Sequence, residues 1–90
     1  MSNSQSDTDF LRMKVITAFR LGKEGEGCDA MVKFMDCLQQ ILNDNIELLG
    51  SDEAILIKEL LAAQRRGDYI FVADLLEYLL PTTVIGKVIV

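Results

Sequence analysis

The chain has 90 residues, half of them hydrophobic, and a net charge of -5 from 9 basic and 14 acidic side chains. This length suits one domain and excludes two independent cores, while the negative charge repels nucleic-acid phosphates and anionic lipid headgroups. We therefore expect one domain over residues 1–90 that binds neither nucleic acid nor membrane.

The first segment, residues 1–6, is polar and lacks the cationic and apolar parts of a signal peptide. We predict that it is a disordered leader. No apolar run approaches the roughly 20 residues that span a bilayer, so the sequence indicates a soluble, cytoplasmic protein.

The residue types that catalytic and metal sites need are scarce. The sequence has no histidine, and Cys28 and Cys37 are its two cysteines. On one helix they would be separated by about 13 Å of rise, too far for a disulfide, so we expect reduced, buried thiols. We predict no catalytic, cofactor-binding or metal-binding residue, with an enzyme built on Asp74, Glu77 and Tyr78 as the open alternative.

The first predicted helix covers residues 7–21. Its apolar residues repeat at helical spacing on two adjoining stripes, which are Leu11, Val15 and Ala18, and Ile16 and Phe19. Ser6 or Asp7 can cap its start, and Gly22 ends it. Residues 22–27 then hold three glycines among three charges, which predicts a flexible loop between helices.

The second predicted helix, residues 28–49, has two neighbouring apolar stripes. One contains Met31, Met35, Leu38, Leu42, Asn45 and Leu49, and the other contains Phe34, Cys37, Ile41 and Leu48. Such a helix contacts neighbours on two sides, as in a bundle or a dimer. Asn45 is either a buried amide that fixes the pairing register or the point at which the helix has already reached solvent.

Two further helices are predicted at residues 52–66 and 68–80. Gly50 precedes the first of them, which Ser51 or Asp52 can cap, and Gly67 ends it in a left-handed conformation. Asp68 can cap the second, and Pro81 forbids its continuation. The pattern predicts an all-α fold, either a four-helix antiparallel bundle or two packed helical hairpins.

The last predicted helix places Phe71, Asp74 and Tyr78 on one outward face. Aromatic residues are enriched at protein interfaces, so this face suits a protein contact, unless it covers a loop or the chain's own tail. The tail, residues 82–90, is β-branched and poor in charge, and we expect it to be extended. It would dock on its own bundle or on a second copy of the chain.

The segment Arg66-Gly-Asp-Tyr-Ile-Phe-Val-Ala-Asp-Leu-Leu-Glu-Tyr-Leu-Leu-Pro81, after an Ala-Phe-Arg-Leu helix, resembles a family of small helical proteins from Gram-positive bacteria. The resemblance implies a bacterial origin and an adaptor role, and no catalytic residues. The Gly-Asp-Tyr turn is also similar to a tetratricopeptide hairpin, but Ala73 is misplaced by one residue and Pro81 comes too early. In architecture alone, the chain resembles small acidic flagellar export chaperones.

The high apolar content of so small a chain implies surface that is shared with another chain. We predict a non-catalytic, homodimeric protein-interaction module whose candidate interface residues are Phe71, Asp74, Tyr78, Met31, Met35 and Asn45. The alternative is an export chaperone or adaptor whose groove receives an amphipathic helix of a partner, with Met13, Met31 and Met35 as an adaptable lining.

Overall fold

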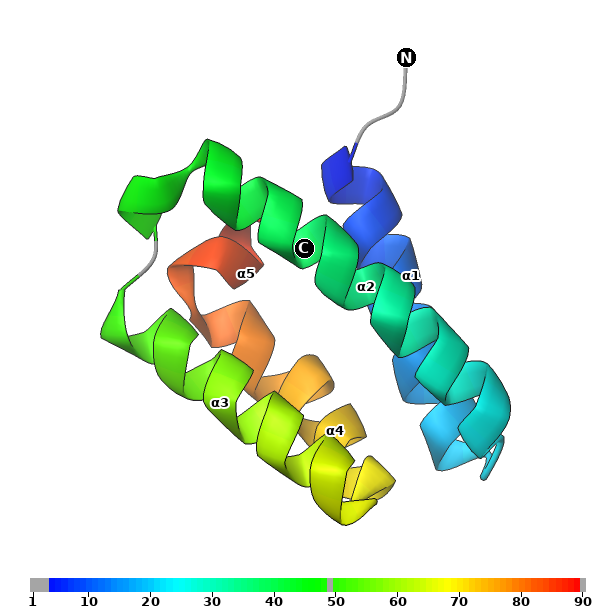
Figure 1. Ribbon diagram of the computed structural model, residues 1–90. Helices are drawn as coiled ribbons and strands as arrows, with labels where there is room; N and C mark the ends of the chain where they lie inside the picture. The colour runs from blue at the N-terminus through cyan, green and yellow to red at the C-terminus, as the bar shows by residue number, and fades with distance from the viewer. Residues whose placement is uncertain (1–3, 49, 90) are drawn as a thin grey trace.

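The computed structural model describes residues 4–48 and 50–89, and within them it is helical with no strand (Figure 1). The five α-helices are α1 (Ser4–Arg20), α2 (Glu24–Asp44), α3 (Ser51–Arg66), α4 (Tyr69–Asp74) and α5 (Val84–Ile89). Three short turns join them: η1 (Ile46–Leu48) and η3 (Leu80–Thr82) are 3-10 helices, and η2 (Leu75–Leu79) is a π-helix. The predicted all-α class is confirmed.

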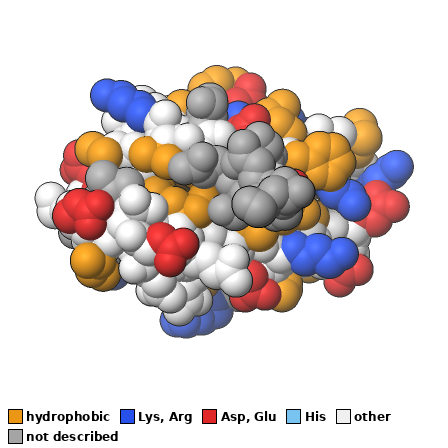
Figure 2. Space-filling model, turned by 90° about the horizontal axis from the view of Figure 1, so that it is seen from above, with side chains coloured by type: hydrophobic (Ala, Val, Ile, Leu, Met, Phe, Trp, Pro, Cys, Tyr) orange, Lys and Arg blue, Asp and Glu red, His pale blue; other side chains and the backbone are white. Residues whose placement is uncertain are grey.

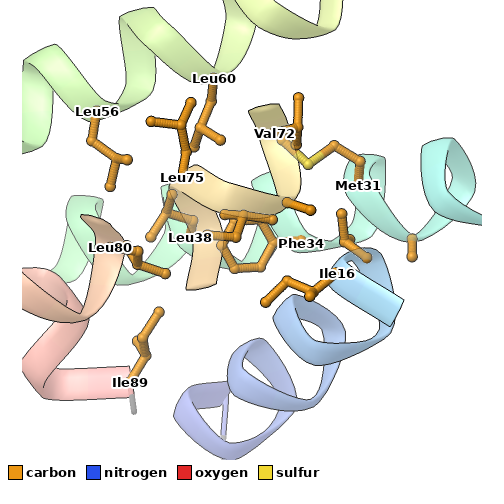
Figure 3. Close-up of a cluster of buried hydrophobic side chains, with 14 of the residues drawn as sticks. Ile16, Met31, Phe34, Leu38, Leu56, Leu60, Val72, Leu75, Leu80 and Ile89 are labelled. Carbon is orange, nitrogen blue, oxygen red and sulfur yellow. The ribbon is translucent and has the colours of Figure 1, made fainter. Parts of the chain in front are cut away.

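The helices pack around one hydrophobic core. α1 runs along α2 and also contacts α4 and α5, while α3 packs on α4 (Figure 1). Within the described residues α2 and α3 have almost no direct backbone contact. All of these elements send side chains into the core, among them Ile16, Phe34, Leu38, Leu56, Leu60, Val72, Leu75, Leu80 and Ile89 (Figure 3).

Glycines end the helices where the sequence predicted. Gly22 follows α1 with φ +76°, and Gly67 follows α3 with φ +75°, a left-handed conformation that costs glycine little. Asp68 then caps α4, since its Oδ1 accepts a hydrogen bond from the N–H of Phe71 at 3.3 Å. These two stops and this cap are confirmed.

The start of α1 differs from the prediction. The helix begins at Ser4, so residues 4–6 of the predicted leader are helical, and a cap at Ser6 or Asp7 is wrong. Residues 1–3 of that leader lie outside the described residues. Further along α1, Thr8 and Arg12 are buried, so the first turns pack against the rest of the protein.

The predicted loop over residues 22–27 is also mostly helical, because α2 begins at Glu24. A Cβ at Gly27 would overlap the ring of Phe19, so glycine at this position lets α1 and α2 approach closely. Glu24 and Glu26 lie in the first turn of α2, where carboxylates complement the helix dipole. Close packing and charge therefore outweigh the low helix propensity of glycine.

The second helix is shorter at its other end than predicted. α2 stops at Asp44, and Asn45 already has a non-helical backbone. Leu49, the predicted last residue, lies outside the described residues. α3 starts after Gly50 and not after a side-chain cap from Ser51 or Asp52.

The Glu53 side chain accepts hydrogen bonds from backbone N–H groups at the start of α3 and at the start of α5. The Glu53 side chain is buried, its Oε1 accepts from the N–H of Gly50 at 3.0 Å, and its Oε2 accepts from the N–H of Val84 at 2.9 Å. Burial alone would raise the pKa of Glu53, but hydrogen bonds from backbone N–H groups at the two helix starts outweigh it, and the pKa lies below its ordinary value.

The predicted helix over residues 68–80 is α-helical only to Asp74. In the π-turn that follows, the N–H of Leu80 donates to the carbonyl of Leu75, five residues earlier. Pro81 has no N–H to give to the carbonyl of Leu76. The Arg12 guanidinium of α1 supplies the donor instead, with Nη1 2.8 Å from that oxygen. α1 is thus fixed to the irregular turn by a buried cation, which Asp9 pairs at 3.0 Å.

The tail was predicted to be extended, and this is wrong for residues 84–89, which form α5. Four contacts with the preceding chain stabilise this helix against the β-propensity of its residues. The Thr83 hydroxyl donates to the carbonyl of Leu80 at 2.7 Å and accepts from the N–H of Gly86 at 3.0 Å. Glu53 caps Val84, and Gly86 lies against the Leu80 backbone. Val90 lies outside the described residues.

Candidate interaction site

The predicted aromatic face on α4 and η2 is only partly free. Phe71 is partly exposed beneath the Arg66 guanidinium, whose carbon lies 5.9 Å from the ring centre. Tyr78 is 64% exposed. The Asp74 carboxylate between them forms an ion pair with Arg20 of α1 at 3.0 Å, so it already has a partner within the chain.

Arg20 connects α1 to this face through two carboxylates. Its Nη2 lies 2.8 Å from Glu77 and 3.0 Å from Asp74. These hydrogen bonds, first that to Glu77 and then that to Asp74, raise the pKa of Arg20 above its ordinary value. Asp74 and Glu77 therefore connect α1 to the α4 and η2 segment through ion pairs at the surface.

The other three predicted interface residues lie apart from this face. Met31 is fully buried in the core, and Met35 is half-buried on α2. The Asn45 amide donates to the carbonyl of Ile41 at 2.8 Å at the end of α2. That bond satisfies the amide locally, as expected if the helix ends near solvent. The structure does not bring the six residues into one site.

Between α2 and α3 lies an apolar groove of about 520 Å³. Its lining residues are Met35, Leu38, Gln39, Leu42, Asn43, Ile46, Ile57 and Leu61. Leu38 and Leu42 are buried and form the floor, whereas Ile46 and Leu61 remain 63% and 45% exposed. We call this the α2–α3 groove.

The sequence pattern predicted the α2 side of this groove but not the α3 side. The predicted stripe on the second helix contains Met35, Leu38 and Leu42, and all three line the groove. The opposite wall, Ile57 and Leu61 of α3, depends on how far apart the two helices stand. No local pattern in the sequence reports that separation, because it depends on how distant parts of the chain pack.

A second apolar surface lies on α1, and sequence reasoning missed it. Phe10, Met13 and Leu21 are exposed, at 68%, 47% and 65%, and together with Thr17 they share one side of the helix. They line a shallow hollow of about 380 Å³. The helical spacing of these apolar residues in the sequence could have indicated this surface. We call this the α1 stripe.

The cysteines and carboxylates do not form a chemical centre in the described part of the chain. Cys28 and Cys37 are free and half-buried, less buried than predicted. A hydrogen bond with Cys28 raises the pKa of Tyr69, whose ring stacks on Phe19 at 4.7 Å. Among the described residues no cluster of three or more potential ligands from His, Cys, Asp and Glu could hold a metal ion.

The exposed apolar side chains are spread among charged ones on the surface. The face in Figure 2 shows hydrophobic groups beside acidic and basic groups. In the described residues no helix is both long and apolar enough to cross a membrane. No family model, no curated protein and no solved structure matches the chain, so the three resemblances remain predictions.

Proposed function

We propose that this protein is a non-catalytic interaction module that binds an amphipathic helix of a partner protein in the α2–α3 groove. The observation that carries the proposal is the groove itself, in which the buried Leu38 and Leu42 lie beside the exposed apolar side chains of Ile46 and Leu61. Amphipathic helices commonly bind in such grooves through apolar residues repeated every three or four positions.

The groove offers enough apolar surface for specific binding. Each large apolar side chain that enters such a site contributes about 1.5–3 kcal/mol, and the cost of association must be subtracted. Three or four inserted side chains would contribute roughly 4.5–12 kcal/mol, and after an association cost of at least about 4 kcal/mol the affinity would be micromolar at best. Met35, an unbranched side chain on the wall, can adapt its shape to different partners.

Replacing Leu61 with serine is expected to weaken binding of the partner helix by at least tenfold, because Leu61 is an exposed wall of the groove. The measurement is site-specific photo-crosslinking in cells from position 61, followed by titration of the crosslinked partner's helix against the wild type and Leu61→Ser. Ile55→Ser is the matched control, since Ile55 is equally apolar and exposed on the same helix but does not line the groove. Crosslinks of equal yield from both positions would contradict the proposal.

A homodimer formed through the α1 stripe is the second candidate function. The exposed side of α1 presents Phe10, Met13 and Leu21 without a covering element from the described chain. A two-fold axis would pair this stripe with itself, since a symmetric dimer uses the same surface on both copies. The dimer leaves the α2–α3 groove open for a partner.

We expect light scattering behind a sizing column to give a dimer for the wild type and a monomer for Phe10→Ser/Leu21→Ser. The pair Phe71→Ser/Tyr78→Ser serves as the comparison, because it alters the aromatic face on α4 and η2 instead. It should leave the dimer intact. If only Phe71→Ser/Tyr78→Ser gives a monomer, the dimer interface lies on the aromatic face. If the wild type is a monomer at millimolar concentration, neither surface forms a dimer.

A further inference from the structure

The two walls of the α2–α3 groove carry opposite charges at their outer edges. On α3, Lys58 follows the lining residue Ile57 and Arg65 is one helical turn beyond Leu61, so both lie on the exposed side of that wall. The nearby acidic residue Glu59 points to the other side of α3 by helix geometry.

The α2 side of the groove is acidic. Asp36 is exposed and lines a hollow that faces α1; because it follows the lining residue Met35, helix geometry places it at the outer edge of the groove wall. Glu47 is exposed in η1, next to the lining residue Ile46. Lys33, a cation of α2, lines the same hollow as Asp36, but helix geometry places it farther around α2 from the groove.

These four charges are available to a partner. In the described part of the chain neither Asp36 and Glu47 nor Lys58 and Arg65 take part in an ion pair. A helix in the groove would therefore have a negative edge along one flank and a positive edge along the other. Turning the helix end over end exchanges its two flanks.

We infer that the α2–α3 groove binds its partner helix in one direction, with a Lys/Arg flank facing α2 and an Asp/Glu flank facing α3. The inference rests on the proposed function and adds the chemistry of the partner: an apolar stripe bordered by bases on one side and acids on the other. Opposed charges specify partner and orientation more than they add affinity.

The size of the preference follows from the kind of ion pair formed. Exposed ion pairs are individually weak. In one orientation of the bound helix both of its flanks face opposite charges, whereas in the reversed orientation both face like charges. We expect about a tenfold preference at low ionic strength. It should shrink in 1 M salt, where the screening length falls to about 3 Å.

The experiment uses two synthetic helical peptides about 18 residues long, which is sufficient for helix formation. They have the same composition and the same leucine stripe, but the lysine and glutamate flanks are exchanged between them. Each has a nitroxide at its N-terminus, and amide signals of the isotope-labelled protein are recorded by NMR. We expect both peptides to bind, one broadening the Met35 end of the groove and the other broadening the Ile46 end.

Charge variants of the protein separate edge charge from apolar binding. Lys58→Glu/Arg65→Glu makes both edges acidic, and each peptide should then broaden both ends. Arg66→Glu/Lys87→Glu changes the net charge equally at exposed positions that line neither the groove nor the hollow on α1, and should preserve the opposite directions.

The outcomes separate the inference from the function on which it rests. If both peptides bind but broaden the same end, or each broadens both ends of the wild type, the direction is not set by charge and the inference is wrong while the groove function stands. If neither peptide shifts the signals of Met35, Ile57 and Leu61, the groove does not bind helices and the proposed function is overturned.

Discussion

Gly86→Ala is expected to destabilise the protein by about 3 kcal/mol, at the upper end of the range for overpacked sites. A Cβ at this position would overlap the carbonyl oxygen of Leu80, a backbone atom that cannot move as a side chain can. α5 would have to leave the Leu80–Pro81 turn and take Ile85 and Ile89 out of the core. Thermal unfolding followed by circular dichroism should show a Tm lowered by more than 10 °C.

Gly25→Ala is the matched control for this change. Gly25 is also a helical glycine, but nothing lies within 4 Å of the position that its Cβ would take. Alanine has a higher helix propensity than glycine by about 1 kcal/mol, so Gly25→Ala should leave stability equal or slightly higher. A Tm within 2 or 3 °C of the wild type for Gly86→Ala would show that α5 does not pack on Leu80.

Glu53→Gln is expected to cost about 1–3 kcal/mol at pH 7, the usual cost of leaving a buried hydrogen-bond donor unsatisfied. The two carboxylate oxygens accept from Gly50 and Val84, at the starts of α3 and α5. Glutamine keeps the shape but has one acceptor oxygen, so one of these N–H groups loses its partner. Urea unfolding at pH 7 measures the difference from the wild type.

The same residue makes stability depend on pH. The pKa of Glu53 is lower in the folded protein than in the unfolded chain, where the pKa of glutamate is about 4.3. Its stabilisation is therefore complete above about pH 4.3 and is lost as the pH falls through the lower folded value. We expect the free-energy difference between wild type and Glu53→Gln to shrink in that acid range.

Glu59→Gln, at an exposed position of the same helix, is the control for the Glu53 experiments. Its free energy of unfolding should equal that of the wild type at pH 7 and in the acid range. A difference between wild type and Glu53→Gln that stays constant from pH 7 to well below pH 4 would contradict the assignment of Glu53 as a charged cap, and would attribute the effect to packing alone.

Only part of the candidate site was predictable from the sequence. The stripe Met35, Leu38 and Leu42 has helical spacing and was recognised as an apolar seam. The same pattern also placed Met31 with these residues, yet Met31 is fully buried. Periodicity states which side of a helix is apolar, and it does not state which part of that side a neighbouring helix covers.

The sequence by itself determined the all-helical class and the local signals that divide the chain. Gly22 and Gly67 adopt left-handed conformations, and Asp68 caps its helix, because these effects depend on a few adjacent residues. The tertiary structure decided where α2 starts and whether the tail is helical. Gly27 meets Phe19 only when α1 and α2 pack together, and Glu53 is 31 residues from the N–H it caps in α5. Contacts over such distances can outweigh local propensities of about 1 kcal/mol.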